Sequence, residues 1–180
     1  MGRIFEKLFS SPTPRQYCES LPREILAKLN AWWSDLPAHL LPNYPTPPMH
    51  FRATSYLHLR YHQYVMLLTR PYLLKSAVDE PCEFTAACEQ SNSQSIKIVK
   101  DLGKRSLLSQ MNYLDGSYIL STGMILFLRA LRRPSKELLD EVEGYRPTLQ
   151  VAQHLRVGRA ASESMASFAQ NLRALLEKSG

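Results

Sequence analysis

Two histidines are placed where they could share a ligand. His58 and His62 stand four residues apart, a spacing that brings both imidazoles to one face of a helix, as in a zinc protease. The residues between them include no glutamate that could act as a base, and Arg60 supplies a cation where a cation would bind. Metal sites normally also need three protein ligands. We therefore predict two packed, hydrogen-bonded core histidines, with no metal site and no cofactor.

The chain also lacks the common motifs of a catalytic site. It contains no Gly-x-Ser-x-Gly nucleophile elbow, no Gly-x-Gly-x-x-Gly turn and no phosphate-binding loop. Its carboxylates cluster mainly at Asp140, Glu141 and Glu143, without a neighbouring base. Three scattered cysteines fit buried, inert thiols in a reducing compartment better than a disulfide framework. We predict that this chain is not an enzyme.

The charge balance is weakly basic, with 22 Lys and Arg against 16 Asp and Glu, a net charge of +6. Lys97, Lys100, Lys104 and Arg105 share one helical face, but no aromatic side chains interleave with them, which favours a solvated face over a nucleic-acid site. No apolar run reaches the roughly 18 residues that span a bilayer, because residues 118–131 are interrupted by Ser, Thr, Gly and Arg. We expect neither specific nucleic-acid binding nor membrane association.

Apolar positions recur at helical spacing almost everywhere, which predicts an all-α chain without a sheet, an irregular array of about six to seven helices. We interpret residues 1–180 as one helical domain. Residues 1–10 look like the end of an incomplete helix with one apolar face, and residues 37–48 form a stiff, proline-rich connection. The other expected helices cover residues 20–36, 50–74, 79–102, 118–133, 135–142 and 148–178.

The segment from residue 50 to residue 74 is apolar on most faces, so we expect it at the centre of the domain. Pro71 removes a helical hydrogen bond and predicts a kink or a stop near the end of this helix. Arg70 follows an apolar run, so its guanidinium should be partly buried and need an acceptor. The carbonyls freed by Pro71 are the favoured partners, ahead of a bound effector.

A small effector could lodge between this segment and the apolar segment around residues 118–128. Phenols, an imidazole and flexible thioethers would orient and fit such a molecule. The alternative is that the same side chains simply fill the core, since close packing leaves few voids. The candidate ligand-binding residues are Tyr61, His62, Tyr64, Met66, Tyr118 and Met124.

Residues 57–73 read Leu-His-Leu-Arg-Tyr-His-Gln-Tyr-Val-Met-Leu-Leu-Thr-Arg-Pro-Tyr-Leu. This segment is the first of three ordered elements that resemble the fungal-specific transcription factor domain, the middle homology region of zinc binuclear cluster regulators, and it is similar to the signature helix of that family. Residues 29–37 resemble its Leu-x-x-Trp-x-x-x-Leu-Pro element. The structural signature is carried by Trp32, His58, Arg70 and Pro71.

A third element begins at Cys88, which with Ile96 is similar to the family's Cys-x-x-Ala-Ala-x-x-Ile helix. Ser91 and Asn92 stand where the two alanines are usual. The resemblance covers roughly residues 1–131, and the family's six-cysteine zinc cluster is absent from the chain.

The resemblance implies a nuclear, all-α regulatory domain that controls activation without itself binding DNA, and it implies no catalysis. Two hypotheses stay open. In the first, the domain responds to a small apolar inducer. In the alternative, it is a helical protein-interaction scaffold with no small-molecule ligand, whose partners are other domains of the same regulator or coregulator proteins. The apolar face of residues 1–10 further predicts self-association into a homo-oligomer.

Overall fold

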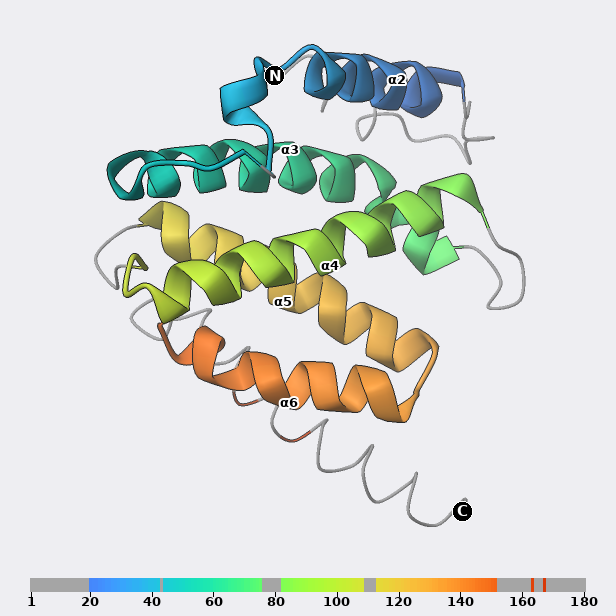
Figure 1. Cartoon of the computed structure of the whole chain (residues 1–180). Coiled ribbons are helices and arrows are strands. Elements are labelled where there is room, and N and C mark those ends of the chain that lie inside the picture. Colours follow the sequence, from blue (N-terminus) through green and yellow to red (C-terminus); the bar gives the residue numbers. More distant parts are fainter. Residues whose placement is uncertain are drawn as a thin grey trace.

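The computed structural model describes residues 20–42, 44–75, 82–108 and 113–151, together with residues 163 and 167. These residues form five α-helices and one short 3-10 helix, and no strand occurs among them (Figure 1). The all-α expectation is confirmed for these residues, which contain slightly fewer helices than the six to seven predicted for the whole chain. The elements are α2 (Ser20–Ser34), η1 (Ala38–Leu40), α3 (Pro48–Lys75), α4 (Glu83–Lys104), α5 (Tyr113–Arg132) and α6 (Lys136–Val151).

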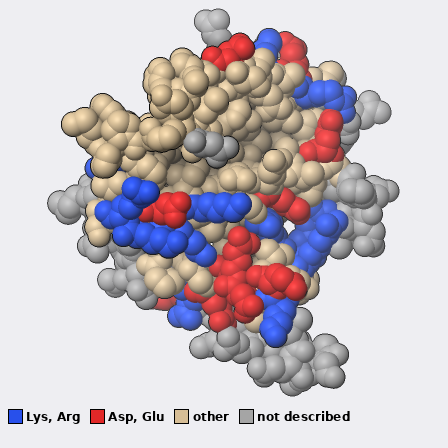
Figure 2. Space-filling view, in the orientation of Figure 1, with Lys and Arg blue, Asp and Glu red and all other residues tan. Residues whose placement is uncertain are grey.

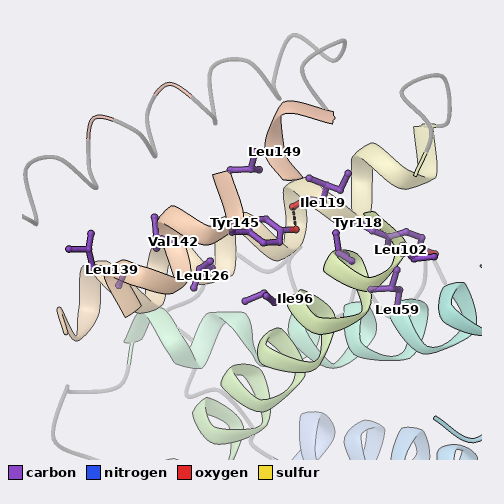
Figure 3. Packing of buried hydrophobic residues seen from close by; sticks show 12 residues of the cluster. Leu59, Ile96, Leu102, Tyr118, Ile119, Leu126, Leu139, Val142, Tyr145 and Leu149 are labelled. Atoms are coloured by element: carbon purple, nitrogen blue, oxygen red, sulfur yellow. Dashed lines mark hydrogen bonds between the residues drawn. The ribbon is translucent and has the colours of Figure 1, made fainter. Parts of the chain in front are cut away.

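The helix α3 occupies the centre of the arrangement, as its apolar sequence predicts. It packs against α2 on one side and against α4 and α5 on the other, while α6 closes the far side by packing on α5 and α4 (Figure 1). In Figure 3, Tyr145 of α6 is drawn inside the main core and donates a hydrogen bond to the Ile119 carbonyl, at 3.1 Å. Its buried apolar neighbours include Leu59, Ile96, Leu102, Tyr118, Leu126, Leu139, Val142 and Leu149.

The helix α6 joins the expected helix at residues 135–142 to the first residues of the one expected at residues 148–178. Gly144 is a residue type that commonly ends a helix and so predicts a break between the two, yet α6 runs through both Gly144 and Pro147. Tyr145 and Leu149 are almost completely buried, so packing on α5 holds this stretch helical despite its weak local propensity. The expected helix at residues 148–178 and the segment at residues 1–10 lie largely or wholly outside the described residues.

Of the two outcomes predicted at Pro71, a kink or a stop, the stop does not occur, because α3 continues through Pro71 to Lys75, close to the expected end at residue 74. The residues after the proline explain the continuation. Tyr72 and Leu73 are buried, and the Tyr72 ring stacks on Phe84 of α4 with 4.3 Å between centroids. Burial of these two side chains offsets the hydrogen bond that the proline removes.

The helix α2 is less buried than its apolar stripe suggests. Pro22 is its only buried residue, and Trp32 remains 43% exposed. Among the described elements α2 packs mainly against α3, so only one face is covered. The large apolar residues from Ile25 to Leu36 recur at helical spacing, which predicts a buried stripe. In the structure they are half-buried or, at Trp32, exposed, so this helix is held less firmly than the others.

One helical stretch in the described residues, Leu114–Arg132 of α5, is long and apolar enough to cross a membrane. The sequence-based expectation that no run has this property is thus too strict. Half of this stretch is buried within the fold. The buried core helix of a soluble protein can have the same length and apolar composition as a membrane-spanning helix.

Candidate functional site

His58 lies in the interface between α3 and the connection that follows α2. Its Nε2 is 2.7 Å from the carbonyl oxygen of Leu40, so this nitrogen carries the proton and donates the hydrogen bond. Burial lowers the pKa of the imidazole, and Trp33 meets the ring edge-on with 5.1 Å between centroids. His58 is therefore the packed, hydrogen-bonded histidine that the sequence predicts.

His62, one turn further along α3, has a different environment. The side chain is buried, and Nδ1 has no hydrogen-bond partner in the structure, contrary to the expectation of a bonded core histidine. Burial, followed by the nearby His58, lowers the pKa of His62 to about 4, so the ring is neutral at pH 7. Within the described part of the chain, no cluster of three His, Cys, Asp or Glu side chains could hold a metal ion.

Aromatic rings from α2 cover this part of α3. Trp33 stacks on Tyr61 with 4.2 Å between ring centroids and lies 5.6 Å from the His62 ring. The Tyr61 hydroxyl donates to the Asn30 side-chain oxygen at 2.8 Å. Trp32, which carries the family resemblance, lies at the outer edge of the stack, 6.3 Å from Tyr61. Ring stacking with one hydrogen bond thus fastens α2 to α3.

A cavity of about 490 Å³ opens beside these rings, between α2, α3 and α4. Its walls combine aromatic carbon with amide and hydroxyl groups, so they can contact both an apolar and a polar part of a small molecule. All three elements that carry the family resemblance contribute to it, including Ser91 at one of the unusual positions of α4. The lining includes Trp33, Tyr61, His62, Ala87, Gln90, Ser91 and Gln94.

A second, smaller hollow of about 280 Å³ lies between α3 and α5, where the sequence analysis expected an effector. Tyr64, Met66 and Met124 line it, together with two arginines, Arg60 and Arg70. The six candidate ligand-binding residues therefore do not form one site. Tyr61 and His62 line the first cavity, and Tyr118 is buried in the core.

Tyr118 still lies close to the second hollow through Arg60. The Arg60 guanidinium is 5.7 Å from the centre of the Tyr118 ring and 5.9 Å from that of Tyr64. Both distances are within the range of cation–π attraction. Arg60 therefore rests on two aromatic faces.

Arg70 does not play the structural role that the sequence suggested. Its side chain is half-buried, as expected, but within the described part of the chain it makes no hydrogen bond to the carbonyls near Pro71. The guanidinium instead lines the hollow between α3 and α5. Pro71 removes a helical hydrogen bond, but no hydrogen bond from Arg70 compensates for it among the described residues.

Two buried polar networks were not predicted from the sequence. In the first, Arg52 of α3 donates to an Asp115 carboxylate oxygen at 3.0 Å, and the Tyr56 hydroxyl donates to the other oxygen. The Asp115 side chain is fully buried, inside the first turn of α5. In the sequence, the Asp115-Gly116 pair is a turn signal, although a carboxylate in an apolar helix also indicates a buried cationic partner.

The second network explains the departure from the family pattern at Asn92, which is completely buried in α4. Its amide nitrogen donates to the Thr122 carbonyl at 2.8 Å, and Arg129 donates to its oxygen, also at 2.8 Å. Arg129 in turn lies 3.7 Å from a Glu141 oxygen. An alanine at position 92 could not join α4, α5 and α6 in this way.

The basic face of α4 is not a continuous cationic stripe. Arg105 lies 4.0 Å above the ring of Phe51, and Lys104 lies 3.8 Å from an Asp101 oxygen. On the face drawn in Figure 2, basic and acidic side chains lie side by side across the lower half of the molecule. This mixture supports a solvated surface over a nucleic-acid interface.

Comparison with known proteins gives one informative similarity. The chain is 27% identical over 143 residues to an uncharacterized transcriptional regulatory protein of Schizosaccharomyces pombe. The match covers 76% of this chain but only 18% of the length of that protein. No protein-family model matches the chain, and no solved structure matches it significantly.

Proposed function

We propose that this chain is the helical regulatory domain of a fungal zinc-cluster transcription factor, which controls activation without itself binding DNA. The similarity to a transcriptional regulatory protein supports a role in transcriptional regulation, and a nuclear location is part of this proposal. The all-helical fold is consistent with the domain type that the sequence resembles. The proposal treats residues 1–180 as one domain and assigns no catalytic step and no cofactor to it.

In this proposal, the cavity between α2, α3 and α4 binds a small effector, which is largely apolar but carries one hydrogen-bonding group. The observation that carries this proposal is the buried Nδ1 of His62, which has no partner and belongs to a side chain that lines the cavity. A buried imidazole nitrogen without a partner is costly. Because Nδ1 itself is buried, a ligand group gains this energy only when the ring turns toward the cavity on binding. Trp33 and Tyr61 offer ring faces to the apolar body.

The position of the cavity indicates how binding could be transmitted. The helix α2 is the least buried of the five, and the cavity lies between it and the central pair α3 and α4. A ligand that contacts all three helices stabilises the docked position of α2 over any detached one. We infer that the docking of α2 is the element that the effector controls.

The competing function, a protein-interaction scaffold without a small ligand, has its own observation. Leu74, Met124 and Leu131 are large apolar side chains that remain at least 49% exposed. Exposed apolar surface of this kind marks protein contacts. Partners would be other domains of the same regulator or coregulator proteins. A homo-oligomer through residues 1–10 also stays a proposal, because these residues lie outside the described ones.

A thermal-shift screen tests the effector site. The probes are planar apolar molecules with one polar group, such as indole and p-cresol. A probe present at a hundred times its dissociation constant should stabilise the fold by about 2.7 kcal/mol. Ala87→Trp, which fills the cavity, should abolish the shift. Met124→Trp, in the other hollow, is the matched control and should retain it. No shift with any probe, or loss of the shift only in the Met124 variant, contradicts the assignment.

A further inference from the structure

Exposed apolar side chains adjoin one end of the hollow between α3 and α5. On α3, Leu67 lines the hollow, and Leu74, seven residues later on the same helical face, is 61% exposed. On α5, Met124 and Leu128 line it, and Leu131 is 49% exposed one turn further on. Apolar side chains of both helices thus continue beyond the hollow, and we refer to the hollow together with these two leucines as the groove.

Two cations border this groove at separate points. Arg60 and Arg70 both line it, and within the described part of the chain neither forms an ion pair with a carboxylate. They are ten residues apart on one helix, which corresponds to about 15 Å along its axis. One small anion cannot contact two cations at that separation. An elongated partner with a carboxylate near each end can.

We propose that this groove docks an amphipathic helical segment of another protein or domain, with acidic residues flanking a short apolar face. Such a helix presents apolar side chains at positions i, i+3, i+4 and i+7, which match an apolar groove between two helices. Its carboxylates, about ten residues apart, then meet Arg60 and Arg70. Met66 and Met124 line the groove and adapt to different apolar side chains. This docking does not depend on the effector cavity, so the two proposals can fail separately.

The experiment uses the full 180-residue chain and a fluorescently labelled synthetic helical peptide. The peptide carries four apolar residues at positions i, i+3, i+4 and i+7, with glutamates ten residues apart at its ends. Two control peptides replace the glutamates with lysines or the apolar residues with alanines. Fluorescence anisotropy should show binding of the acidic peptide about tenfold or more tighter than either control. The affinity should fall as salt rises.

A charge reversal in the groove tests the contact directly. Arg60→Glu combined with Arg70→Glu should weaken the acidic peptide about tenfold and should favour the lysine peptide instead. The exchange of preference also shows that the variant is folded. The matched control is Lys97→Glu combined with Lys104→Glu, which makes the same change in net charge on exposed residues of α4 and should leave the preference unchanged.

Four results would overturn the proposal. The lysine peptide could bind as well as the acidic one, or the α4 control could weaken binding as much as the groove variant. Decanoate, at concentrations too low for it to form micelles, could displace the acidic peptide. The groove would then be a binding site for small carboxylic acids. Finally, light scattering could show a dimer that Met124→Glu converts to a monomer, in which case a second copy of the chain occupies the groove.

Discussion

The helix α3 meets α2 and α5 in opposite ways. Towards α2 it presents Tyr61 and neutral histidines, which pack on half-buried aromatic rings. Towards α5 it presents Arg52 and Tyr56, which hold a fully buried carboxylate, and further along the arginines of the groove. The contact with α5 contains polar groups whose separation would leave a buried group without its hydrogen-bond partner. The contact with α2 consists mainly of ring stacking.

This difference suggests a division of roles within the domain. Buried hydrogen-bonded charges specify one arrangement and are strongly destabilising when one partner is lost. Half-buried aromatic contacts are weaker, about 0.5–1.5 kcal/mol for each pair beyond the area that they bury. We therefore expect α3, α4, α5 and α6 to form a fixed frame, while α2 is the part whose docking an effector could control.

The largest effect is expected at the fixed side. Asp115→Ala leaves Arg52 and Tyr56 without their common acceptor, and the unfolding free energy should fall by about 3 kcal/mol. Urea denaturation measures this change. Asp115→Asn keeps an oxygen that can accept a hydrogen bond and should lose clearly less. A loss below about 1 kcal/mol for the alanine variant would mean that the carboxylate is not a structural tie, and the comparison between the two contacts would fail.

The second tie should have a smaller effect. Asn92→Ala removes the donor to the Thr122 carbonyl and one acceptor of Arg129, which retains Glu141 and Ser93 nearby. We expect a loss of about 2 kcal/mol in the unfolding free energy. Ser93→Ala removes only the longer, 3.3 Å bond to Arg129 and serves as the control. Equal losses in the two variants would place the stabilisation in the arginine and not in the asparagine.

The smallest effect is expected for Arg70→Ala. Without a hydrogen bond to the backbone near Pro71, the side chain contributes little to the fold, and the unfolding free energy should change by less than about 0.5 kcal/mol. If Arg70 held the carbonyls freed by Pro71, as the sequence predicts, removing it would leave these buried acceptors without a donor and would cost about 2 kcal/mol or more. A loss of that size in thermal or urea unfolding would restore the structural interpretation of Arg70 and weaken the case for the groove.

The sequence predicts the helical class and the central place of α3 because both depend on apolar periodicity, which is a local property. It predicts the hydrogen-bonded His58 but not the orphaned nitrogen of His62, since the two residues have the same spacing and differ only in what packs opposite them. Spacing along one helix cannot reveal which partner lies across an interface.

The failures at Pro71 and Gly144 have a related cause. Each residue is a local signal for a helix end, and each is overruled by buried neighbours, Tyr72 and Leu73 in α3 and Tyr145 in α6. The sequence also did not predict that the candidate ligand-binding residues would be divided between two hollows. Tyr61 and Tyr64 are three residues apart, yet one faces the cavity under α2 and the other lines the groove beside α5.

The central claim is that α3 presents a neutral, hydrogen-bonding imidazole at the cavity beneath α2. Because the pKa of His62 is lower in the fold, about 4 against 6.5, the unfolded chain binds a proton first as the pH falls. His62 therefore favours the folded state fully above pH 6.5, and this contribution is lost between pH 6.5 and about 4.

The most direct measurement is an NMR titration of the His62 ring nitrogens in the folded chain, assigned with the variant His62→Gln. The structure predicts that the ring remains neutral down to about pH 4, so that its nitrogen shifts change only near that value. A midpoint near the ordinary histidine value of 6.5 would show an accessible, solvated imidazole. That result would contradict the buried, unpartnered nitrogen on which the proposed effector site depends.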